Sequence, residues 1–118
     1  MFISVDPAAS TPPYEQIRTQ VRDAVSAGAL AAGAKLPTVR ALATDLGLAV
    51  NTVARAYREL ETDGVIETRG RAGSFVAPQG DAGQQQAQVA AREFVERARR
   101  LGVDDTSALD LVRAAQRG

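Results

Sequence analysis

Two stretches of the chain repeat apolar residues at helical spacing, and two short β-prone segments joined by a glycine-containing turn follow them. Each repeat falls at i, i+3, i+4 and i+7, which predicts a helix with one core-facing stripe. The first stripe comprises Val39, Leu42, Ala43 and Leu46, and the second comprises Val53, Ala56, Tyr57 and Leu60. Gly47 separates the two helices. Asn51 is expected to cap the second helix, which runs to Asp63, with Gly64 closing it at C′.

Two β-prone segments follow, at residues 65–69 and 74–77. They are rich in β-branched and aromatic side chains, and Gly70 and Gly73 between them can supply the positive φ of a tight turn. An earlier helix is expected after the N-cap Thr11 and Pro12, with a stripe of Tyr14, Ile17, Val21, Ala24 and Val25. Residues 34–36 form a short extended link to the next helix. This order predicts a mainly α fold with a small β wing, a winged helix-turn-helix.

The second motif helix has a polar face opposite its apolar stripe. At 100° per residue this face carries Asn51, Arg55, Arg58 and Thr62, flanked by Thr52 and Glu59. An arginine fork can bond guanine O6 and N7 together, and the free N–H groups of a helix start attract a phosphate. A solvated helix face is the simpler alternative, but the position before a hairpin favours contact with DNA. Arg69 and Arg71, at the tip of the hairpin, suit a minor groove or phosphates.

Three spaced motifs occur in order between residues 36 and 76: LPTVR, NTVARAYRELE and RAGSFV. This segment resembles the DNA-binding domain of GntR-family bacterial transcription regulators, and residues 2–16 resemble the N-terminal start of the small YtrA-like branch. The resemblance implies DNA contacts by Thr38, Arg40, Asn51, Thr52, Arg55, Arg69, Arg71 and Gly73. Ala49-Val50 stands where the branch often has Asn-Pro, and Ala54 stands where some other branches place a DNA-contacting Arg. The base preference therefore cannot be copied from relatives.

A different pattern follows residues 78–86, which are polar and interpreted as a linker or a frayed helix start. A coiled-coil-like seam then comprises Ala87, Ala91, Phe94, Ala98 and Leu101. Gly102 can end this helix, and Asp104 or Asp105 can start another. The stripe of this last helix comprises Ala108, Leu111, Val112 and Ala115. The two helices either fold back on the winged helix as core or pair with a second chain. The resemblance favours a homodimer, with residues 1–78 as the DNA-binding domain and 79–118 as a C-terminal helical dimerisation hairpin.

Composition narrows the function classes further. The chain has 118 residues, 14 basic and 14 acidic side chains, and no cysteine or histidine. A net charge of zero opposes DNA binding mildly, so a positive face must come from the arrangement of the bases. Without thiols or imidazoles, catalysis, a cofactor and a metal site are not expected. No apolar run reaches about 18 residues and no leader is evident, so a cytoplasmic protein without a membrane partner is expected.

These observations predict a regulator, a repressor that binds a pseudo-palindromic double-stranded DNA operator as a homodimer. One alternative is a protein-interaction module whose exposed Arg55, Arg58 and Arg71 meet an acidic partner. Another is a piece of a larger regulator fused to an aminotransferase-like half, for which the chain lacks length and a Schiff-base lysine context. A small-molecule effector of unknown identity stays open, and would have to use a cleft between the domain and the C-terminal helices.

Overall fold

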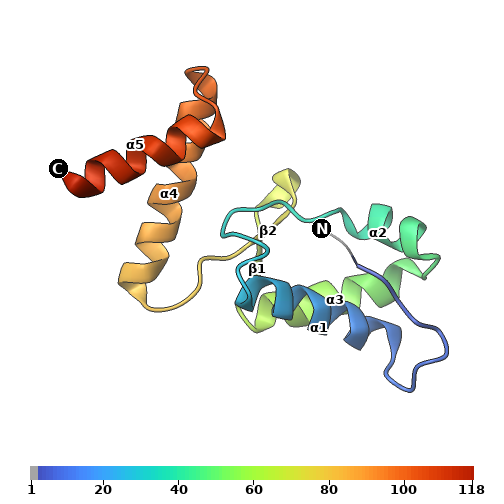
Figure 1. Ribbon diagram of the computed structural model, residues 1–118. Coiled ribbons are helices and arrows are strands. Elements are labelled where there is room, and N and C mark those ends of the chain that lie inside the picture. Colours follow the sequence, from blue (N-terminus) through green and yellow to red (C-terminus); the bar gives the residue numbers. More distant parts are fainter. Residues whose placement is uncertain (1–2) are drawn as a thin grey trace. The chain divides into compact units, whose positions relative to one another are not determined.

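Three helices and a two-stranded wing are followed along the chain by two further helices (Figure 1). The computed structural model describes residues 3–118, apart from the side chains of residues 82 and 83. The chain divides into two compact units, with the boundary along the chain between Gln79 and Gly80. The first unit contains α1 (Pro13–Ser26), α2 (Val39–Leu46), α3 (Val50–Thr62), β1 (Ile66–Thr68) and β2 (Ser74–Val76). The second contains α4 (Ala82–Arg100) and α5 (Asp105–Arg117).

The core of the first unit lies where α1 and α2 pack against α3. Its largest fully buried side chains come from α1, α3 and β2: Ile17, Val21, Val53, Leu60 and Val76. Burial of one such branched side chain contributes about 1.5–3 kcal/mol, so the stripes read from the sequence drive this packing. The expectation that the first helix completes a three-helix core is confirmed. This helix begins one residue later than predicted, at Pro13, because a residue that precedes proline avoids helical geometry and Pro12 is extended.

The start of α3 differs from the expectation. The helix begins at Val50, its N-cap is Ala49, and no side chain accepts a capping hydrogen bond there. Gly47, in the left-handed conformation with φ 67°, ends α2, and the half-buried Leu48 packs against the core. These two residues fix where the chain turns, which leaves Ala49 as the last extended residue. The prediction of Asn51 as N-cap is therefore wrong, whereas Gly64 does follow the last turn with φ 76°.

The wing is an antiparallel pair in which Ile66 lies opposite Val76 and Thr68 opposite Ser74. Both strands are shorter than the predicted residues 65–69 and 74–77, and a 3₁₀ turn at Gly70–Ala72 forms the tip between them. Residues 34–36, predicted as a link only, lie along β2 together with Gly33. The Gly33 N–H donates to the Val76 carbonyl at 2.8 Å, the Leu36 N–H donates to the Ser74 carbonyl at 2.9 Å, and the Val76 N–H donates to the Ala34 carbonyl at 2.9 Å.

The second unit is a helical hairpin, as the sequence predicted. Its first helix starts at Ala82, within the segment interpreted as a linker or frayed start. Asp81 and Gln84 form a reciprocal capping box, which satisfies free N–H groups of the first turn and lets the helix begin early. Asp104 caps α5 by accepting from the Ser107 N–H at 2.8 Å. Within the described residues, none of the helices combines the length and apolar character that crossing a membrane requires.

Candidate nucleic-acid interface

The two sides of α3 differ sharply in burial. Val53, Ala56, Tyr57 and Leu60 are buried, whereas Asn51, Arg55, Arg58 and Thr62 are exposed and Thr52 is half-buried. The Tyr57 hydroxyl donates a 2.7 Å hydrogen bond to the Pro37 carbonyl and so ties α3 to the residue before the N-cap of α2. The polar residues predicted to meet DNA therefore lie on a helix whose opposite side is held firmly in the core.

Arg55 lies against α1. Its guanidinium carbon is 3.7 Å from the centroid of the Tyr14 ring, which is the distance of a stacked cation–π pair. Among the described residues, no side chain or carbonyl accepts a hydrogen bond from Arg55. The arginine is thus held by a flat apolar face while its N–H donors stay available.

The start of α2 supplies two further predicted contacts. Thr38 is the N-cap, and its hydroxyl oxygen accepts a 3.1 Å hydrogen bond from the Ala41 N–H. Arg40 lies in the first turn and is exposed. The sequence resemblance gave both residues a place beside phosphate, and the structure adds that Thr38 already serves a capping role.

The wing brings together more cations than the sequence indicated. Arg69 lies 4.4 Å from the Phe75 ring centroid and donates to the Glu67 carboxylate at 2.6 and 2.9 Å. Lys35, on the segment beside β2, lies 6.0 Å from the same ring. Sequence reasoning missed Lys35 because residues 33–36 carry no strand pattern of their own. Arg71 is exposed in the tip.

Gly73 has a structural reason to be glycine. Its φ is 110°, and a Cβ added there would lie 3.2 Å from Cε of Lys35. A side chain at this position would strain the backbone and press on a cation of the wing. Its place in the predicted set thus follows from the shape of the wing, independently of any contact with DNA.

The ion pairs of the first unit show which cations the carboxylates engage, although the net charge is zero. Arg18 donates a hydrogen bond to Glu15 and lies 3.5 Å from Asp63. The Arg18–Glu15 hydrogen bond holds the pKa of the Glu15 carboxyl below its ordinary value. Within the described part of the chain, no carboxylate pairs with the predicted contacts Arg40, Arg55, Arg58 and Arg71. Glu15, Asp23, Asp63 and Glu67 pair with Arg18, Arg22 or Arg69, so no ion pair engages the four predicted contacts.

In the second unit, the predicted dimerisation residues occupy different surroundings. Ala98 is buried, Phe94 and Leu101 are 38% and 72% exposed, and Leu111 and Val112 are 53% and 39% exposed. Ala87 and Ala91 are exposed as well. The seam therefore mixes an intra-hairpin contact with side chains that this unit leaves uncovered. Sequence reasoning missed Leu109, which is 50% exposed on α5.

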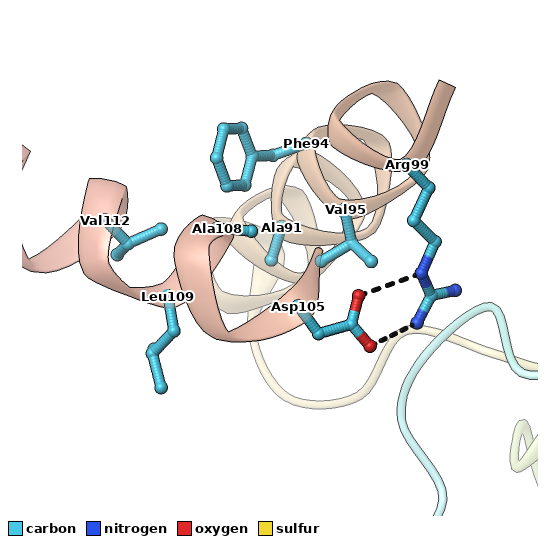
Figure 2. A pocket seen from close by; sticks show the side chains of 8 residues that line it. All are labelled: Ala91, Phe94, Val95, Arg99, Asp105, Ala108, Leu109 and Val112. Atoms are coloured by element: carbon cyan, nitrogen blue, oxygen red, sulfur yellow. Dashed lines mark hydrogen bonds and ion pairs between the residues drawn. The ribbon is translucent and has the colours of Figure 1, made fainter. Parts of the chain in front are cut away.

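A largely apolar groove of about 470 Å³ runs between α4 and α5 (Figure 2). Its lining comprises Ala91, Phe94, Val95, Arg99, Asp105, Ala108, Leu109 and Val112. Arg99 and Asp105 close one part of it with two hydrogen bonds of 3.1 and 2.9 Å. The same contact lowers the pKa of the Asp105 carboxyl below its ordinary value. No cluster of acidic, histidine or cysteine side chains in the described residues could hold a metal ion.

Residues 13–76, from the start of α1 to the end of β2, match the family model described as "Bacterial regulatory proteins, gntR family". The chain belongs to the GntR family. It is a DNA-binding helix-turn-helix transcription regulator of the small YtrA-like subfamily, and this family is one of regulators rather than enzymes. The individual DNA contacts named above stay predictions.

Named relatives of this GntR regulator cover most of its length. The "HTH-type transcriptional regulator Rv1152" of Mycobacterium tuberculosis is 50% identical over 108 residues, which is 92% of this chain and 88% of that protein. The "HTH-type transcriptional repressor YtrA" of Bacillus subtilis is 48% identical over 77 residues, 64% of this chain and 58% of that protein. The structure of YtrA from Sulfolobus acidocaldarius, a GntR-family transcription factor, is 27% identical with a TM-score of 0.61. The match covers 96% of this chain and 95% of the S. acidocaldarius chain.

Proposed function

We propose that this GntR regulator is a homodimeric repressor that recognises a specific, pseudo-palindromic operator with one winged helix per half-site. Repression would follow from occupancy, because a dimer bound across a promoter excludes other proteins from it. The similarity to the B. subtilis repressor YtrA supports the direction of regulation. Residues 1–78 would bind DNA and residues 79–118 would hold two chains together.

The observation that carries the DNA-reading part is the set of unpaired arginines on α2, α3 and the wing. An unpaired guanidinium on an exposed helix can turn its fork to a guanine edge, whereas one held by a carboxylate must first give up that partner. Two such forks, Arg55 and Arg58, share the exposed side of α3. Arg71 at the wing tip has the reach and charge for a phosphate.

The homodimer part rests on the hairpin of the second unit. Single exposed apolar side chains are ordinary on a protein surface, but α4 and α5 expose several large ones on two adjacent helices. They comprise Val89 and Phe94 on α4, Leu101 at its C-cap, and Leu109, Leu111 and Val112 on α5. A two-helix unit of 39 residues buries little by itself, so a second copy of the same hairpin is a partner of matching chemistry.

Two substitutions test the dimer. Leu101→Asp and Phe94→Asp would place a carboxylate in an apolar interface, where it would be buried without a partner. We expect both variants to sediment as monomers while circular dichroism shows the helix content retained. Leu101 is the cleaner position because it is the more exposed within one chain. Gln86→Asp, an exposed polar position near the start of α4, is the matched control and should stay dimeric.

The same variants test the coupling between assembly and DNA. A monomer keeps every base contact but loses the high effective concentration of the second winged helix, so its affinity for a paired site should fall by orders of magnitude. Its affinity for a single half-site should not change. Variants that stay dimeric would show that the seam is misassigned, and variants that unfold would show that these side chains belong to an intramolecular core.

A further inference from the structure

The Arg55–Tyr14 stack is the closest aromatic–cation contact among the described residues. It joins α3, which carries the predicted base contacts, to α1, which the sequence assigned only to the core. Tyr14 is half-buried at the edge of the hydrophobic core, so packing fixes its ring. Arg55 is exposed at the other side of this contact. A rigid aromatic face therefore supports a side chain that would otherwise be free.

This geometry has a direct physical effect on arginine. An unsupported arginine has several rotatable bonds, and ordering it on a base edge costs side-chain entropy. Stacking on a ring restricts the plane of the guanidinium before binding but uses none of its N–H donors. The donors thus stay directed outward around the edge of the fork, in the arrangement that two acceptors on one guanine require.

We propose that Tyr14 is a positioning residue for base recognition, whose ring holds the Arg55 guanidinium ready for a guanine edge. This inference rests on the proposed contact between Arg55 and a base. Tyr14 itself need not touch DNA. Its contribution would be to lower the cost of ordering Arg55, and so to raise the preference for the correct base over others.

The residues around the stack favour this role over one in which a carboxylate holds Arg55 away from DNA. Glu15, which follows Tyr14, interacts electrostatically with Arg55, but its carboxylate bonds Arg18 on the same helix. Arg18 also lies 3.5 Å from Asp63, the C-cap of α3, whereas the buried Glu59 Oε2 has no hydrogen-bond partner. Arg55 stacks on the ring and is attracted by the Glu15 charge, but it makes no ion pair in the described residues, so it can leave or keep the ring without breaking one.

The test compares Tyr14→Leu with the matched control Tyr14→Phe in the full chain. Leucine keeps an apolar side chain against the core but has no flat face, whereas phenylalanine keeps the ring. The probes are the tightest duplex recovered from a random pool and a random-sequence duplex of equal length. We expect Tyr14→Leu to lower the ratio of the two affinities about three- to tenfold and Tyr14→Phe to leave it unchanged. Affinity for the random duplex should stay the same in both.

A double-mutant cycle with Arg55→Ala separates this role from a purely structural one. In the Arg55→Ala background, Tyr14→Leu should have no further effect on the ratio. Thermal unfolding of each variant checks the fold, and Tyr14→Met replaces the leucine variant if that one is unstable. An unchanged or increased ratio in Tyr14→Leu overturns the proposal, as does an equal loss in the Arg55→Ala background. If Arg55→Ala alone leaves the ratio unchanged, Arg55 makes no specific base contact, and Tyr14 then has no positioning role for it.

Discussion

The arginines of the winged helix differ in what surrounds each guanidinium, and the difference predicts what each would contribute to DNA binding. Arg18 and Arg69 are engaged by carboxylates, Arg55 is stacked on a ring, and Arg71 is exposed with no acidic partner in the described residues. The sequence alone predicted a DNA contact for Arg55 and Arg69 alike. Only the structure separates a guanidinium that is free to bind from one that must exchange partners.

Replacing Arg55 by alanine should reduce specificity more than overall affinity. Loss of one bidentate base contact is expected to reduce the preference for the operator by about 1–3 kcal/mol. Affinities for a selected duplex and a random duplex, measured by fluorescence anisotropy, check this. Arg113→Ala, on α5 of the second unit, is the control of the same residue type and should leave the preference unchanged. An unaltered preference in Arg55→Ala would remove this residue from base readout.

Replacing Arg71 by alanine should weaken binding to all sequences alike. Loss of one phosphate contact is expected to reduce the slope of log K against log salt by about one. Titrations at several salt concentrations measure it. Arg69→Ala should give a smaller reduction, because the Glu67 carboxylate already offsets the charge of Arg69. A loss of discrimination by Arg71→Ala at constant slope would instead assign Arg71 to groove reading.

Among the elements, α3 is the one whose position the site depends on, and Tyr57 ties it to the chain before α2. Tyr57 is 6% exposed, and burial raises the pKa of its hydroxyl to about 12 from the ordinary 10.0. The folded state therefore keeps a proton that the unfolded state loses above pH 10. Stability from this group is fully present below pH 10 and is lost as the pH rises through about 12.

Base titration of the unfolding free energy should show this loss. The difference between the two pKa values corresponds to about 3 kcal/mol at most. Tyr57→Phe should be less stable at neutral pH by about 0.5–2 kcal/mol, since the bond to the Pro37 carbonyl is gone, but should lose less stability between pH 10 and 12. Parallel curves for the two proteins over that range would mean that Tyr57 does not titrate with folding.

The helix stripes and glycine breaks were predictable because local periodicity encodes them. The order of elements followed from the stripes at Val39–Leu46 and 53–60 and from the glycines of the wing. The start of α3 was not predictable in this way, because tertiary contacts of Leu48 override the capping preference of Asn51. The pairing of residues 33–36 with β2 was missed for a related reason: it depends on long-range backbone bonds that leave no local pattern. The stack of Arg55 on Tyr14 likewise joins residues far apart in sequence.

Across the molecule, the connection between the two units is short. The Gln79 amide donates to the Gly64 carbonyl at 3.1 Å within the first unit, and the Gln85 amide donates to the Gly80 carbonyl at 2.8 Å within the second. Both sides of the boundary are thus anchored to their own unit. For a dimer, so short a connection restricts the distances between half-sites that both winged helices can reach.

Insertion of six Gly and Ser residues after Gln79 should relax that restriction. A flexible segment of this length adds a reach of about 13 Å, so the variant should bind half-sites over a wider range of separations, with lower affinity at the best one. The assay uses duplexes in which a selected half-site is repeated at separations stepped by single base pairs. The control carries the same six residues after Gly118 and should behave as the unmodified protein. If the unmodified protein is already indifferent to separation, the connection does not set the geometry.

The three backbone bonds between residues 33–36 and β2 have a consequence for local opening. Two strands of three residues each would be marginal alone, so the wing depends on this third segment for its persistence. The amides of Gly33, Leu36 and Val76 should therefore exchange with deuterium as one cooperative unit and slow together when duplex DNA binds. Residue-resolved exchange with and without duplex would show it. Rapid exchange at Gly33 and Leu36 beside a protected Val76 would mean that the wing opens independently. If the wing opens as one unit, a DNA contact at its tip slows deuterium exchange at amides that lie before α2 in the chain.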